Sequence, residues 1–262
     1  MQGRLSPSQS GRLQFFPQHW EEEFVLARNM GFSHIDWFLD RDIKGFDPIY
    51  DVWMRSEVLE KIDSACSILP LNALDSGRFG LFGAEGEETK KIFHQLLPVL
   101  IPRLTSKIVT FALVEDLAPQ SDSSWNEVRE TIHFLAEHIR PLGARIALET
   151  ELPASELLVF LDSLNDDSVG VCYDTGNTVS LGFDCPQDIQ QLRERIISVH
   201  LKDRKKGSRQ SLLLGTGSVP FPETVQALKE LHFIGPYTLQ AWRGDDYLAD
   251  ARTQLQFIQA YM

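Results

Sequence analysis

Four polar side chains stand where apolar segments end in the second half of the chain. Glu149 lies near the end of RIALET (145–150), Asp174 ends VGVCYD (169–174), and His200 lies within IISVHLKD (196–203). Gln240 follows in YTLQAW (237–242). If these segments are neighbouring parallel strands, their carboxyl ends lie at one edge and the four side chains can converge. Two carboxylates, an imidazole and an amide oxygen suit one divalent ion: Mn²⁺, Mg²⁺, Co²⁺ or Zn²⁺.

Each of these residues alone could be a helix cap or a satisfied core residue. Four polar groups on successive strand ends are better explained by a shared metal site than by four separate structural roles. We therefore predict the metal ligands Glu149, Asp174, His200 and Gln240.

The elements that would position this site alternate along the whole chain. Short apolar segments predict strands at residues 1–5, 34–39, 69–74, 107–114, 145–150, 169–174, 196–203 and 237–242. Amphipathic patterns predict helices at about 19–31, 54–67, 85–103, 123–142, 153–164, 186–195, 220–232 and 246–261. Eight strand–helix units in this length indicate an α/β fold, a single (β/α)₈ TIM barrel spanning 1–262. The first strand is expected to be short because it begins at Met1.

The composition of the chain bears on which partners it can bind and on the compartment in which it is expected. The 262 residues carry a net charge of −12, so a nucleic-acid surface is not expected, because binding a phosphate backbone needs a basic face. No signal peptide opens the chain, and no apolar segment approaches the ~20 residues of a membrane span. The three cysteines form no metal-binding pattern, so free thiols and a cytoplasmic location are expected.

Six motifs occur in the same order as in a known family. MQGRLSP, ALE, YDTGN, VHLKD, LGTGSVPF and GPYTLQAW resemble the motifs of the xylose isomerase-like TIM barrels. The resemblance is to the sugar-phosphate isomerase and epimerase branch, with L-ribulose/L-xylulose-5-phosphate 3-epimerases and hexulose-6-phosphate isomerases. In that branch the metal is held by Glu, Asp, His and Glu, which correspond to Glu149, Asp174, His200 and Gln240.

The resemblance also implies the catalytic residues Glu149 and Gln240, because the first and last glutamates of the family act as acid/base groups. Gln240 stands in place of the second glutamate. An amide oxygen can ligate a metal or hold a hydroxyl, but an amide does not exchange a proton near neutral pH.

The implied function is a metal-dependent isomerase or epimerase of a ketose or ketose phosphate. Glu149 would take a proton from the carbon next to a metal-polarised carbonyl. Gln240 leaves two alternatives open, a catalytically impaired sugar-binding or regulatory homologue and a keto-sugar dehydratase. A nuclease of the endonuclease IV group shares the barrel but needs more histidine ligands, which disfavours it.

The expected partner is a small sugar or sugar phosphate, with no nucleic acid and no membrane; a homodimer is an open alternative. The basic segment KDRKKGSR (202–209) is either a solvated loop or a phosphate site, and LDSGRFGLFG (74–83) is a second phosphate candidate. The predicted substrate-binding residues are Arg4, Ser76, Arg78, Asn177, Lys202 and Arg243.

Overall fold

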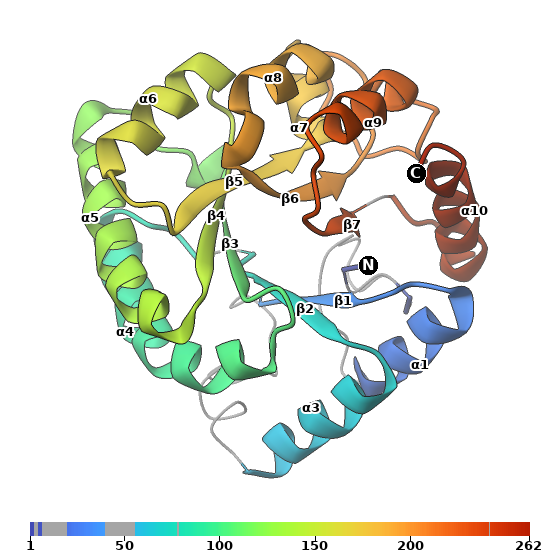
Figure 1. Cartoon of the computed structure of the whole chain (residues 1–262), viewed down its shortest axis with the longest axis horizontal. Helices are drawn as coiled ribbons and strands as arrows, with labels where there is room; N and C mark the ends of the chain where they lie inside the picture. Colours follow the sequence, from blue (N-terminus) through green and yellow to red (C-terminus); the bar gives the residue numbers. More distant parts are fainter. Residues whose placement is uncertain (3–4, 7–19, 40–55, 78, 241) are drawn as a thin grey trace.

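In the part of the chain that the structure describes, seven parallel strands form one sheet and are paired in chain order. The computed structural model describes residues 1–2, 5–6, 20–39, 56–77, 79–240 and 242–262. Figure 1 shows the strands at the centre of a ring of helices. The strands are β1 (Ile35–Phe38), β2 (Leu71–Asp75), β3 (Ile108–Leu113), β4 (Arg145–Thr150), β5 (Val169–Asp174), β6 (Ile196–Leu201) and β7 (Tyr237–Leu239).

Helices follow the strands on the outside of this sheet (Figure 1). They are α1 (Trp20–Met30), α3 (Ser56–Ile68), α4 (Gly83–Leu100), α5 (Asp122–Ile139), α6 (Ala154–Leu164), α7 (Thr175–Ser180), α8 (Cys185–Leu192), α9 (Phe221–Glu230) and α10 (Tyr247–Gln259). Short 3₁₀ turns lie at Ile101–Arg103, Glu115–Leu117, Arg140–Leu142 and Arg193–Arg195. The predicted α/β barrel is confirmed by this arrangement.

The strands are mainly apolar because both of their faces are covered. Every residue of β5 and β6 is buried, by helices outside and by neighbouring side chains inside the barrel. The predicted bounds of the strands at 145–150 and 169–174 agree with β4 and β5.

The predicted first strand differs from what the structure describes. Residues 3 and 4 lie outside the described part, and no strand is assigned to Met1, Gln2 or Leu5. Met1 nevertheless accepts a backbone hydrogen bond from Asp36 of β1 at 2.9 Å. The Thr238 hydroxyl of β7 also donates to the Asp36 carboxylate, which links the last strand to the first. The start of the chain therefore lies where the predicted first strand would close the barrel.

The strand register brings the polar strand ends to one mouth of the barrel. Asp174 is paired with His200 across β5 and β6, and Glu149 is paired with Ala112 across β4 and β3. The amide of Gln240 donates to the carbonyl of Leu201 at 3.0 Å, which continues the β6–β7 pairing beyond Leu239.

The opposite mouth holds a separate cavity of about 800 Å³. Its lining includes Ile108 and Arg145 at the starts of β3 and β4 and Ile197 near the start of β6. A small apolar cluster of Ala73, Ile108, Ala147, Cys172 and Ile197 fills the barrel interior. Because Ile108 and Ile197 line the cavity and Cys172 borders the polar strand ends, this cluster separates the two mouths.

Among the described residues, no helix combines the length and the apolar character that crossing a bilayer requires.

Candidate active site

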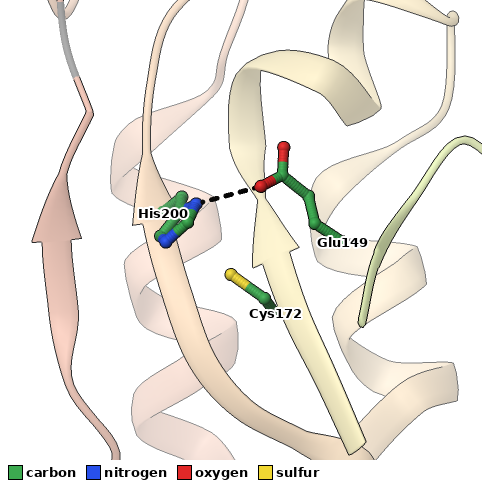
Figure 2. Close-up of side chains that lie close together, drawn as sticks. All are labelled: Glu149, Cys172 and His200. Atoms are coloured by element: carbon green, nitrogen blue, oxygen red, sulfur yellow. Dashed lines mark hydrogen bonds and ion pairs between the residues drawn. The ribbon is translucent and has the colours of Figure 1, made fainter. Parts of the chain in front are cut away.

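Three side chains from neighbouring strands point toward one another at the mouth that holds the polar strand ends. Figure 2 shows Glu149 of β4, Cys172 of β5 and His200 of β6 around a common point. One ligand atom from each lies within 4.8 Å of the other two, and all three residues are buried. The sequence predicted Glu149 and His200 here; it did not predict Cys172.

Glu149 is held through both of its carboxylate oxygens. Asn177 Nδ2 donates to Oε1 at 2.5 Å, and His200 Nδ1 lies 3.2 Å from Oε2. Burial would raise the pKa of this carboxyl, but the contact with His200 and the positive charges of Lys202 and Arg204 outweigh it and lower the pKa. Glu149 is therefore ionised near neutral pH, which is the charge state that a general base requires.

The other ring nitrogen of His200 faces a second buried carboxylate. His200 Nε2 lies 3.8 Å from Asp75 Oδ2 at the end of β2, and Gln2 Nε2 donates to the same oxygen. Burial raises the pKa of Asp75 to about 7. A carboxylate behind a histidine fixes the orientation of its ring, which is the usual arrangement around a metal-binding imidazole.

Cys172 contributes a thiol to the same region. Burial raises its pKa to about 11, so the group is a neutral thiol at physiological pH. Because Cys172 and Asp174 are two residues apart on one strand, their side chains lie on the same face of β5. That spacing was the signal in the sequence that could have placed Cys172 beside the ligand set.

Asp174 combines a structural and a chemical position. Its Oδ1 accepts from the amide of Asn177 at 2.7 Å, which caps the N-terminus of α7. Asn177 was expected in a loop, but Thr175–Ser180 forms α7, and Asn177 lies in its first turn. The cap places Asn177 so that its side chain reaches Glu149. Oδ2 of Asp174 lies 3.5 Å from Lys202 Nζ.

Gln240 lies in the same buried group. Its Oε1 accepts from Lys202 Nζ at 3.0 Å, and its Nε2 lies 3.3 Å from His200 Nδ1. Lys202 is itself buried, with 6% of its surface exposed. The structure thus brings together Glu149, Asp174, His200, Gln240, Asn177 and Lys202 of the predicted site residues.

Asp203 fixes the loop that follows β6. Its carboxylate accepts backbone hydrogen bonds from Gly215 at 2.9 Å, Gly217 at 2.8 Å and Val219 at 3.2 Å. Asp203 thus holds the loop through its carboxylate, whereas the Lys202 side chain faces the site.

The basic segment 202–209 is divided by burial. Lys202 and Arg204 are buried, whereas Lys205, Lys206 and Arg209 are exposed. Arg204 Nη2 lies 3.6 Å from Glu115 Oε1, and Arg209 contacts Glu115 at 3.4 Å and Glu151 at 3.1 Å. The segment therefore reaches across the mouth to the ends of β3 and β4.

If the exposed part of this segment holds a substrate phosphate, its neutralisation should act selectively. Replacing Lys205, Lys206 and Arg209 together by Gln is expected to weaken binding of a ketose phosphate by about tenfold or more, because charge-assisted hydrogen bonds are lost. Binding of the matching free ketose should change little. Isothermal titration calorimetry with both sugars measures this, and equal losses for both would assign the segment to a solvated loop.

The other predicted substrate-binding residues lie elsewhere or outside the described part. Ser76 is fully buried, and its amide donates to Thr110. Arg243 is buried and donates from Nη1 to the carbonyl of Ser6 at 2.5 Å, and burial lowers its pKa to about 10. Arg243 thus contacts the N-terminal segment. Arg4 and Arg78 lie outside the described residues.

Comparison with known proteins gives consistent matches over most of the chain. L-ribulose-5-phosphate 3-epimerase UlaE of Escherichia coli (strain K12 / DH10B) is 21% identical over 257 residues, covering 93% of this chain and 90% of that protein. The structure of D-allulose 3-epimerase from Methylomonas sp. in complex with D-allulose has a TM-score of 0.74 at 18% identity, covering 95% of this chain and 93% of that one.

A third similar structure is a xylose isomerase-like TIM barrel protein from Mycobacterium smegmatis in complex with magnesium. Its TM-score is 0.73 at 19% identity, and the match covers 92% of this chain and 88% of that one. At such identities these two structures establish the shared fold. The family model described as xylose isomerase-like TIM barrel matches residues 24–261, and the chain therefore belongs to this family.

Proposed function

We propose that this chain is an isomerase or epimerase of a ketose or ketose phosphate, and that Glu149 takes a proton from the carbon next to the carbonyl. The observation that carries the proposal is the buried, ionised Glu149 carboxylate beside His200, held by Asn177. The similarity to L-ribulose-5-phosphate 3-epimerase and to D-allulose 3-epimerase supports the reaction class.

The donor set fits a divalent ion such as Mn²⁺, Mg²⁺, Co²⁺ or Zn²⁺. Glu149 Oε2 and His200 Nδ1 lie 3.2 Å apart, and the other oxygen and nitrogen of these side chains already face Asn177 and Asp75. Asp174 lies beside this pair: Oδ1 caps α7 and Oδ2 lies 3.5 Å from Lys202 Nζ, outside the group of Glu149, Cys172 and His200 whose ligand atoms lie within 4.8 Å of one another. Glu149, Asp174 and His200 would hold the ion, which when bound would polarise the substrate carbonyl and stabilise the enediolate.

The protein side chains account for the remaining steps. Asn177 keeps Oε1 of Glu149 occupied, so that Oε2 is directed at the centre. Gln2 donates to Asp75, whose carboxylate lies 3.8 Å from His200 Nε2 on the far side of the ring. Gln240 contributes hydrogen bonding without proton exchange, so of the two residues that correspond to the acid/base pair of the family, Glu149 is the one that can move a proton on and off carbon. This arrangement favours proton transfer on one face of the substrate.

A solvent-exchange screen tests the proposal whatever the product of the reaction is. The purified protein is loaded with a divalent ion and incubated in deuterium oxide with ketopentoses, ketohexoses and their phosphates. NMR should then show deuterium at the carbon next to the carbonyl for at least one sugar. Binding of a sugar with no exchange in the whole series would instead identify a catalytically impaired homologue, and loss of water from a keto-sugar would identify a dehydratase.

Removal of Asp174 is expected to abolish binding of the divalent ion. Asp174→Ala deletes an anionic ligand from the centre of the site, so the metal content should fall from about one ion per chain to near zero. Inductively coupled plasma mass spectrometry after dialysis measures this.

Asp184→Ala is the matched control, because Asp184 caps α8 as Asp174 caps α7, accepting from Gln187 at 2.9 Å. That variant should lose about 1 kcal/mol of stability, as expected for a lost helix cap, and keep its metal. Unchanged metal content in Asp174→Ala would remove Asp174 from the ligand set.

A further inference from the structure

Lys202 is a buried cation placed among the site residues. Its ammonium lies 3.0 Å from Gln240 Oε1, 3.5 Å from Asp174 Oδ2 and 3.5 Å from Asn177 Oδ1. All three neighbours are themselves buried. An ammonium has three donors and no acceptor, so it favours oxygen atoms on every side.

The path of the Lys202 side chain is fixed by α7. The Thr175 hydroxyl donates to the Lys202 carbonyl at 2.6 Å and lies 3.1 Å from the Lys202 amide nitrogen. A side chain at Gly176 would place its Cβ 2.9 Å from Lys202 Cγ, so the glycine is what lets the lysine stem pass. The backbone and the stem of Lys202 are therefore both held, and its ammonium has a defined position.

This position determines which way the amide of Gln240 points. The amide oxygen faces the Lys202 ammonium, because the ammonium is a hydrogen-bond donor and the amide nitrogen is also a donor, so the two nitrogens could not bond to each other. The nitrogen then faces His200 Nδ1, at 3.3 Å. An amide nitrogen is a donor with no lone pair for a metal, so in this orientation Gln240 presents hydrogen atoms to the centre.

We propose that Lys202 is a positioning residue that keeps the Gln240 oxygen out of the metal shell and makes Gln240 a hydrogen-bond donor at the centre. Glu149, Asp174 and His200 are then the only ligands among these four residues, and the N–H of Gln240 is available to a substrate oxygen. The inference rests on the metal-assisted function proposed above, and it replaces the fourth ligand expected from the sequence.

Metal affinity separates this arrangement from a four-ligand site. Mn²⁺ dissociation constants are measured by isothermal titration calorimetry for the wild type, Gln240→Ala, Lys202→Met and the double variant. Gln240→Ala should change the affinity by less than about threefold in the wild type, because no ligand is lost. Lys202→Met should tighten binding by about tenfold or more, because it removes a positive charge next to Asp174 and frees the amide to turn.

The decisive comparison is between the change in Mn²⁺ affinity that Gln240→Ala causes in the wild type and the change that it causes in the Lys202→Met variant. In the Lys202→Met background the same substitution should weaken Mn²⁺ binding by about fivefold or more, because the freed amide oxygen has become a ligand. Lys205→Met, which removes an exposed charge of the same segment, is the control and should leave the affinity unchanged. If Lys202→Met does not fold by circular dichroism, Lys202→Gln carries the same test.

A loss of about tenfold or more for Gln240→Ala in the wild type would overturn the inference, since it would make Gln240 a ligand. Equal affinities of the wild type and Lys202→Met would also overturn it, as would a failure of both proteins to bind Mn²⁺. The proposed reaction is judged separately by deuterium exchange. Mn²⁺ affinities as expected without deuterium exchange would support the inference and contradict the proposed function. Deuterium exchange with affinities that differ from those expected would support the proposed function and contradict the inference.

Discussion

Glu149→Gln is expected to abolish deuterium exchange at the carbon next to the carbonyl. The substitution keeps the size of the side chain and its contact with Asn177 but removes the group that accepts the proton. Loss of a general base lowers rates by about 10²–10⁴-fold, and Gln240 cannot take over as a second base. The measurement is the NMR exchange rate of the best sugar in the substrate screen, compared between variant and wild type at equal metal occupancy.

Glu151→Gln is the matched control for this variant. Glu151 lies two residues farther along the chain and pairs with Arg209 at 3.1 Å at the rim of the mouth. Its loss should leave exchange nearly unchanged. Exchange that persists in Glu149→Gln at more than about a tenth of the wild-type rate would show that another group is the base.

Gln240→Glu is expected to raise epimerisation from near zero. Inversion at carbon requires a proton to leave one face and return on the other, and an amide cannot return it. A carboxylate at this position would restore an acid/base group and an anionic ligand for the metal. Proton transfer by a positioned group is worth about 10²–10⁴-fold, so an increase of about a hundredfold in epimer formation is expected.

The comparison uses epimer formation and C–H exchange measured together. The wild type should exchange without epimerising, the behaviour of an enzyme that moves a proton on one face through Glu149. Gln240→Met, which fills a similar volume without any acid/base group, should not gain epimerisation. Efficient epimerisation by the wild type that Gln240→Glu leaves unchanged would show that the amide is a contact in a complete site.

The positions of the principal site residues could be predicted because strand ends are readable from sequence. All of β5 and the middle of β4 are buried, so their residues form mainly apolar segments that end in polar residues. A polar residue at the end of a buried strand must be satisfied by a partner or serve a function. The order of the strands in the barrel then places Glu149, Asp174 and His200 on neighbouring strands. Gln240 also stands at the end of a predicted strand, so the sequence alone showed that an amide replaces the second glutamate of the family.

Other parts of the site left weaker signals. α7 is six residues long and contains threonine, glycine and asparagine, which are poor helix formers, so its sequence has no helical pattern. The helix exists because Asp174 caps it and because it packs beside β6. The contact between Gln2 and Asp75 joins residues 73 positions apart, and no local pattern predicts such a pair.

The sequence could predict the side to which Lys202 points but not its contact with Gln240. It lies two residues after His200 and one residue past the end of β6, so continued alternation would turn its side chain to the same side as that of His200. That its ammonium would reach Gln240 on the next strand depends on Gly176 of α7, which leaves room for the lysine stem. Local patterns around Gln240 predict no titratable neighbour for its amide, and the fold supplies one from an adjacent strand.

The three hydrogen bonds that Asp203 accepts have a consequence for engineering this mouth. They tie the loop at 215–219 to the residue after Lys202, so the loop is anchored next to the site. Gly217 has no spare room, since a Cβ there would overlap Asp203 Oδ1. A loop taken from a relative would have to make the same three hydrogen bonds to Asp203. A redesign that seeks a new substrate is better made in the exposed Lys205 and Lys206, which can change without moving the anchor.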